Sequence, residues 1–132
     1  QANYLEVVMS TLNRNLNDVT LQQDDKTRVC VVGASRGYPE DYKTVKGKRI
    51  HGLEKAMDVK GVTVFGAGIA VDDGKFYAAG GRLFSIVAEG DSIVEARQRA
   101  YSAIAHVNVE DNNLHYRTDI GWRDVERVLN CD

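Results

Sequence analysis

The spacing of hydrophobic positions near the start of the chain predicts an amphipathic helix over residues 4–16. Apolar side chains recur there at intervals of three and four residues, at Tyr4, Leu5, Val8, Met9, Leu12 and Leu16. Polar side chains fill the opposite face. No clear capping residue precedes this helix, which favours a chain that continues from an earlier segment.

The middle of the chain follows the shorter period of β-strands. Apolar and β-branched runs predict strands over residues 27–32, 62–65, 69–71, 75–79 and 82–88, with a polar loop over 33–48. The Asp-Gly pair at 73–74 lies between two of these runs and predicts a hairpin. Eleven of the twelve glycines lie between Gly33 and Gly90, so we expect tightly turned antiparallel strands rather than a helical bundle.

After Gly90 the pattern returns to helical spacing. Ser92 and Glu95 form a capping box ahead of an apolar stripe that continues to Ala105, and this predicts one long helix. A short strand at 115–117 and a helical turn or two over 122–129 complete the chain. The predicted class is α+β: a small antiparallel β-meander with one long helix packed across it.

Composition narrows the possible functions. The chain has 132 residues, 43% of them hydrophobic, and a formal net charge of −2, which suits one domain with a core of its own. A sequence pI of about 5.9 argues against a nucleic-acid-binding protein, and no apolar run is long enough to cross a membrane. The first residues do not resemble a signal peptide, so we expect a cytoplasmic protein. In that compartment Cys30 and Cys131 would be free thiols, with a single disulfide as the alternative.

One motif is typical of hydrolases. Gly33-Ala34-Ser35-Arg36-Gly37 follows a predicted strand and fits the G-x-S-x-G nucleophile elbow. The elbow requires a helix directly after it, whereas Pro39 follows here in a turn-like stretch. A serine hydrolase that uses Ser35 is therefore the less favoured alternative, and we expect this serine to bond backbone amides in a loop.

Three other features of the sequence are candidate binding sites. Two of them, a nucleotide-binding loop and a metal site, lack the required pattern, and the third fits an anion site. Residues 66–71 begin like a dinucleotide-binding loop but lead into a hairpin turn instead of a helix. The three histidines have no metal-ligand spacing, so we predict no metal site and no catalytic residue in this chain. Gly80-Gly81-Arg82 places an arginine beside two glycines at the start of a strand, a combination that suits a phosphate or carboxylate. A β-bulge with a surface arginine is the equally weighted alternative.

Six short motifs occur together in one order along the chain. They lie at residues 34–39 (Ala-Ser-Arg-Gly-Tyr-Pro), 52–54 (Gly-Leu-Glu), 64–68 (Val-Phe-Gly-Ala-Gly), 80–82 (Gly-Gly-Arg), 90–91 (Gly-Asp) and 116–121 (Tyr-Arg-Thr-Asp-Ile-Gly). In this order the chain resembles the C-terminal domain of phosphoribosylamine–glycine ligase, also called glycinamide ribonucleotide synthetase. Arg36 and Gly66 are among the positions that depart from the family's pattern.

The resemblance implies a fold, a division of the chain and an activity. The fold is that of the C-terminal domain of ATP-grasp carboxylate–amine ligases, with residues 1–20 as the tail of the preceding ATP-grasp domain and 21–132 as the C-terminal domain. The enzyme joins glycine to 5-phosphoribosylamine in purine biosynthesis through a glycyl phosphate made from ATP. ATP and Mg²⁺ or Mn²⁺ would bind outside this chain, on the N-terminal and ATP-grasp domains that are its implied partners.

The resemblance also implies which residues meet the substrate. The phosphoribosylamine-binding candidates are Arg82, Gly80, Gly81, Ser35 and Gly37. Because the nucleotide-binding motifs are missing from this sequence, we expect the chain by itself to be inactive. A stand-alone small-molecule binding module of the same fold is the alternative function.

Overall fold

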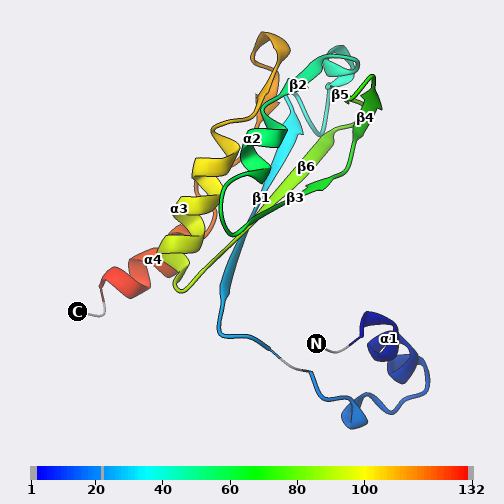
Figure 1. Ribbon diagram of the computed structural model, residues 1–132, viewed down its shortest axis with the longest axis vertical. Coiled ribbons are helices and arrows are strands. Elements are labelled where there is room, and N and C mark those ends of the chain that lie inside the picture. The colour runs from blue at the N-terminus through cyan, green and yellow to red at the C-terminus, as the bar shows by residue number, and fades with distance from the viewer. Residues whose placement is uncertain (1–2, 22, 131–132) are drawn as a thin grey trace.

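The structure is a computed structural model that describes residues 3–21 and 23–130 (Figure 1). Its strands form two four-stranded sheets. The first sheet has the order β3-β6-β1-β8 and consists of β1 (Thr27–Ser35), β3 (Val62–Gly66), β6 (Arg82–Gly90) and β8 (Leu114–His115). The second has the order β4-β5-β2-β7 and consists of β2 (Arg49–His51), β4 (Ile69–Asp72), β5 (Lys75–Ala78) and β7 (Asn108–Val109).

The α+β class and the antiparallel pairing are confirmed, but the single meander is wrong. Strand β1 pairs with β6 and β8, and β3 pairs with β6, so the neighbours in the first sheet are distant in sequence. The predicted hairpin around residues 73–74 is present between β4 and β5. Strand periodicity locates strands but carries no information about partners far away along the chain, and this explains the error.

The long helix predicted after Gly90 is helix α3 (Ile93–Ile104), and it packs across β1 and β6. The predicted capping box is half formed: Ser92 Oγ accepts a hydrogen bond from the Glu95 amide at 3.2 Å. The Glu95 carboxylate accepts one at 2.7 Å from the amide of Asp91, the residue before the N-cap, and not from that of Ser92. Three alanines on the buried face of α3 let the helix approach the sheet closely. The shorter helices α2 (Leu53–Met57) and α4 (Trp122–Leu129) lie on the same side of the first sheet as α3 (Figure 1).

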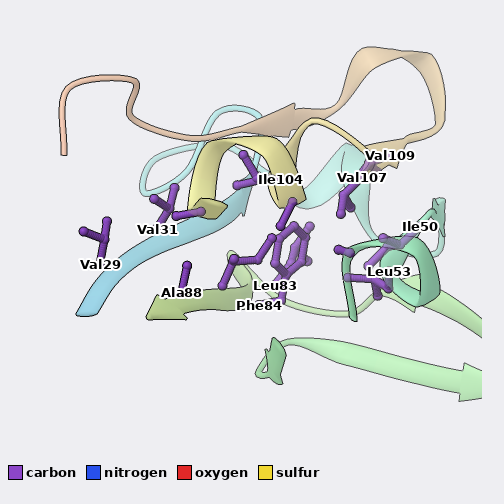
Figure 2. Close-up of a cluster of buried hydrophobic side chains, with 14 of the residues drawn as sticks. Val29, Val31, Ile50, Leu53, Leu83, Phe84, Ala88, Ile104, Val107 and Val109 are labelled. Atoms are coloured by element: carbon purple, nitrogen blue, oxygen red, sulfur yellow. The ribbon is translucent and has the colours of Figure 1, made fainter. Parts of the chain in front are cut away.

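The core lies between α3 and the first sheet, and Phe84 of β6 is at its centre (Figure 2). The Phe84 side chain is fully buried, and its ring covers Gly33, its cross-strand partner on β1. A carbon added at Gly33 would lie 2.6 Å from Phe84 Cε2, so this glycine leaves the space that the ring fills. On the opposite sheet face, Val32 and Phe65 are exposed.

Helix α1 (Tyr4–Leu12) lies away from both sheets (Figure 1). It ends earlier than predicted because Arg14 adopts a positive φ of 60°, and a short 3₁₀ turn, η1 (Leu16–Asp18), follows. The expectation that the helix lacks a cap is wrong, since Asn3 Oδ1 accepts a hydrogen bond from the Leu5 amide at 3.1 Å. The apolar stripe of α1 is exposed, with Tyr4 at 82% and Leu12 at 70%.

We expect this exposed stripe to make the chain associate at high concentration, because large exposed apolar patches seek partners. Light scattering over a concentration series should show a rising mean mass, and Leu5→Gln with Met9→Gln should reduce the rise. Glu6→Gln, on the same helix, is the matched control and should leave the rise unchanged. A monomer at every concentration, with α1 helical by NMR, would contradict this expectation.

A second prediction concerns acid stability. The Arg28 guanidinium hydrogen-bonds both oxygens of Asp24 at 2.7 and 2.6 Å and lowers the pKa of that carboxyl from 3.8 to about 2. A carboxyl whose pKa is lower in the folded state contributes stability above its unfolded pKa, and loses that contribution as the pH falls through the folded value.

The stability difference between wild type and Asp24→Asn should therefore be constant at neutral pH, shrink as the pH falls below about 3.8, be much smaller at pH 2 and vanish below it. Denaturant titrations at a series of pH values measure this difference. Asp25→Asn, which changes the neighbouring exposed carboxylate, is the control. A difference for Asp24→Asn that persists unchanged at pH 2 would contradict the assigned ion pair.

Candidate functional site

The end of β1 is tied to the Gly80–Gly81 turn by two hydrogen bonds. Ser35 Oγ donates to the Gly80 carbonyl at 2.8 Å, and the Ser35 amide donates to the Gly81 carbonyl at 2.7 Å. The Ser35 side chain is only 1% exposed. Ser35 therefore bonds a backbone carbonyl, not the amide we expected, and it holds the turn that leads into Arg82.

This burial removes the serine-hydrolase alternative. A nucleophilic serine must reach its substrate and a base, but the Ser35 hydroxyl is enclosed and donates its proton to a carbonyl. His115 pairs with Ala34 in the β1–β8 ladder, so its side chain lies on the opposite sheet face from that of Ser35. The hydrolase interpretation is wrong.

Gly37 has a role in the loop backbone. Its φ is +88°, and its carbonyl accepts a hydrogen bond from the Asp41 amide at 3.0 Å. A side chain at this position would lie 2.9 Å from the Asp41 carbonyl carbon. Gly37 therefore shapes the turn after β1, and it does not line the pocket described next.

A pocket of about 440 Å³ opens where β1 and β6 meet the 66–68 turn. It is lined by Val32, Tyr38, Ala67, Gly68, Gly81, Arg82 and Ser85. Two of the five predicted substrate-binding residues, Gly81 and Arg82, thus lie on its wall. Gly80 and Ser35 do not line it but are joined to each other by the Ser35 Oγ–Gly80 carbonyl hydrogen bond. The Gly81–Arg82 part of the predicted motif thus lies at a concave surface.

Arg82 is the positive group of this pocket. Its side chain is exposed, and it forms no ion pair or hydrogen bond with the residues described, 3–21 and 23–130. Other arginines form ion pairs within the chain: Arg28 with Asp24, Arg99 with Glu95 and Arg117 with Asp119. The amides of Gly80 and Gly81 likewise donate to no acceptor in the described part of the chain. An unpaired guanidinium on the wall of a pocket suits an anionic ligand.

Two pocket features were missed by sequence reasoning. The Gly68 amide donates to the Arg82 carbonyl at 2.9 Å, and a carbon added at Gly68 would lie 2.7 Å from Gly80 Cα. The 66–68 turn does not have the pattern of a nucleotide-binding loop. Its backbone instead packs closely against the backbone of residues 80–82, and Ala67 and Gly68 form part of the pocket wall. Tyr38 lines the same pocket, and its position beside a proline in a loop gave no signal of this.

The remaining sequence predictions concern residues outside the pocket. Arg36, a departure from the family's pattern, donates from Nε to the Asn112 carbonyl at 2.8 Å. Cys30 is exposed with a free thiol, and Cys131 lies outside the described residues. Within residues 3–21 and 23–130, no three His, Cys, Asp or Glu side chains gather as a metal site. None of the described helices has the length and apolar character that a membrane span requires.

Comparison with known proteins gives a consistent result. The family described as "Phosphoribosylglycinamide synthetase, C domain" matches residues 28–123. The phosphoribosylamine–glycine ligase of Caldanaerobacter subterraneus subsp. tengcongensis is 44% identical over 120 residues, which cover 91% of this chain and 27% of that protein. The ligase of Brucella melitensis is 39% identical over 123 residues, 93% of this chain and 28% of the relative.

A solved structure agrees with both. The crystal structure of phosphoribosylamine–glycine ligase from Thermotoga maritima superposes with a TM-score of 0.62 at 29% identity, over 88% of this chain and 28% of that one. The chain thus spans between a quarter and a third of the length of these relatives. By its family match and its curated relatives, the chain belongs to the phosphoribosylglycinamide synthetase C-domain family, whose members include part of the phosphoribosylamine–glycine ligases.

Proposed function

We propose that this chain acts as the C-terminal domain of an ATP-dependent ligase that joins glycine to 5-phosphoribosylamine, and that it supplies part of the phosphoribosylamine site. The family match beginning at residue 28 supports treating residues 21–132 as this domain. The separate position of α1 (Figure 1) supports assigning residues 1–20 to a preceding ATP-grasp domain.

The observation that carries the proposal is the unpaired Arg82 guanidinium on the wall of the 440 Å³ pocket, free of partners among residues 3–21 and 23–130. Phosphoribosylamine carries a phosphate monoester, which is a dianion or close to it at neutral pH. A planar guanidinium binds two phosphate oxygens at once, and the amides of Gly80 and Gly81 offer further donors beside it. Arg82 therefore holds the phosphate, while Ser35 positions the Gly80–Gly81 turn.

The chemical step is assigned to the rest of the ligase. Glycine's carboxylate takes the γ-phosphoryl group of ATP, and the amine of phosphoribosylamine displaces phosphate from the resulting acyl phosphate to form the amide. ATP and Mg²⁺ bind to the other domains in this proposal. The contribution of this chain is to bind and orient one substrate, so alone it should release no ADP from ATP.

A ligand titration of the chain tests the pocket. Ribose 5-phosphate, which carries a hydroxyl in place of the amine, should shift the backbone amide NMR signals of Gly80, Gly81 and Arg82 in a saturable manner. Arg82→Ala should abolish the shifts. Saturable shifts confined to other surfaces, or none at millimolar ligand, would refute the pocket as the sugar-phosphate site.

The stand-alone binding module is the second candidate, because the core and the lining of the pocket both come from residues of this chain. The two candidate functions predict different coding sequences upstream of Gln1. An open reading frame that encodes an ATP-grasp domain directly before Gln1 would favour the ligase, and one without it would favour the module.

A further inference from the structure

We infer that Tyr38 is the positioning residue of the Arg82 pocket: its ring fixes the Gly81–Arg82 backbone and forms the wall against which the sugar of a phosphorylated ligand lies. This inference rests on the proposed function, since it takes Arg82 as the group that binds the phosphate. Tyr38 has no part in the chemical step.

The first observation is the contact between Tyr38 and Gly81. Gly81 is buried, and a carbon added there would lie 2.6 Å from Tyr38 Cε2 and closer still to Cδ2. Gly81 is not among the glycines with positive φ, so its backbone conformation is open to other residues. The position therefore needs glycine because the aromatic ring occupies the side-chain space.

The second observation is that the ring is held from other directions as well. The Tyr38 amide donates to the Ser35 carbonyl at 3.1 Å, and Ser35 itself bonds Gly80 and Gly81. The ring meets that of Tyr42 edge-on, with centroids 5.7 Å apart and planes at 60°. These contacts join the loop after β1 to the turn before β6, and Arg82 is the first residue of β6.

The third observation is that the ring also faces the pocket. Tyr38 remains 37% exposed and lines the pocket together with Arg82. A sugar phosphate has one strongly charged end and a ring whose C–H groups pack on aromatic faces, so an arginine and an aromatic wall recognise its two parts separately. The Tyr38 hydroxyl has no hydrogen-bond partner among residues 3–21 and 23–130. The contacts of this side chain with Gly81 and Tyr42 are therefore made by the ring.

The test uses the full-length ligase and separates ring, hydroxyl and backbone effects. Tyr38→Ala should raise the KM for phosphoribosylamine about two- to tenfold, with kcat and the KM values for ATP and glycine unchanged. Tyr38→Phe should retain the wild-type KM, since it keeps the ring. Gly81→Ala should raise the same KM because its methyl group displaces the ring. The double variant should be no worse than Tyr38→Ala alone, since residues in contact are not additive.

Phe65→Ala is the matched control, because Phe65 is an exposed aromatic residue that does not line the pocket. It should leave the KM for phosphoribosylamine unchanged, and thermal unfolding should verify that each variant is folded. If Arg82→Ala raises this KM while Tyr38→Ala and Gly81→Ala do not, the inference is overturned and the Arg82 assignment stands. If Arg82→Ala has no effect either, both fail. Independent, additive effects of Tyr38→Ala and Gly81→Ala, or a Tyr38→Phe variant as weak as Tyr38→Ala, would also overturn the inference.

Discussion

Replacing Phe84 by alanine should destabilise the fold by roughly 3–5 kcal/mol, the range found when a large aromatic side chain is removed from a core. Phe84 is fully buried between α3 and the first sheet, and it covers Gly33. Because Gly33 has no side chain of its own, it offers nothing to fill the space that the ring would leave. Native domains are stable by only about 5–15 kcal/mol, so this one change would remove a large share of the total.

Denaturant unfolding monitored by circular dichroism measures the loss. Phe65→Ala is the matched control, since Phe65 is 56% exposed and its removal creates no buried cavity. Gly33→Ala should be destabilising in the wild type, where the new methyl group meets the ring, and less so in the Phe84→Ala background. A loss below about 1 kcal/mol for Phe84→Ala would mean that Phe84 is not central to the core.

The second large effect concerns the substrate. Arg82→Ala in the full-length ligase should weaken phosphoribosylamine binding on the order of ten- to a hundredfold. A charge-assisted hydrogen bond contributes roughly 1.5–3 kcal/mol, and about 1.4 kcal/mol corresponds to a tenfold change in affinity. Arg82 has no protein partner in the described residues, so its removal should change binding and leave stability nearly untouched.

Steady-state kinetics with each substrate varied in turn should show the change in the KM for phosphoribosylamine and hardly any in those for ATP and glycine. Arg82→Lys should recover part of the loss, since lysine keeps the charge without the bidentate fork. Arg123→Ala, which removes an exposed arginine of α4 outside the pocket, is the control. An Arg82→Ala enzyme that is folded and keeps its KM for phosphoribosylamine would make Arg82 a structural surface residue.

The fold could be predicted as far as local periodicity carries information. The strand at 27–32 and the helix after Ser92 were recognised because each is long enough to show its period, and both are present as β1 and α3. Strand β2, strand β7 and helix α2 were missed, since elements of three, two and five residues are shorter than a pattern needs. The pairing of the strands could not be predicted from the sequence because it depends on tertiary contacts.

Part of the candidate site could be recognised from the sequence because it lies in one short segment. Gly80-Gly81-Arg82 is a local motif whose chemistry can be recognised in sequence, and the structure places it at a pocket. The contact of Tyr38 with Gly81 joins positions far apart in the chain, so only the folded chain reveals it. Ser35 illustrates the opposite case: its motif was conspicuous, but burial and the bond to Gly80 give it a structural role.

The most direct test of the Arg82 phosphate site is a crystal structure of the full-length ligase with ribose 5-phosphate bound. We predict the phosphate within hydrogen-bond distance of the Arg82 guanidinium, the amides of Gly80 or Gly81 donating to it, and the sugar ring against Tyr38. A phosphate held by residues outside this chain, with Arg82 turned to solvent, would contradict the central claim.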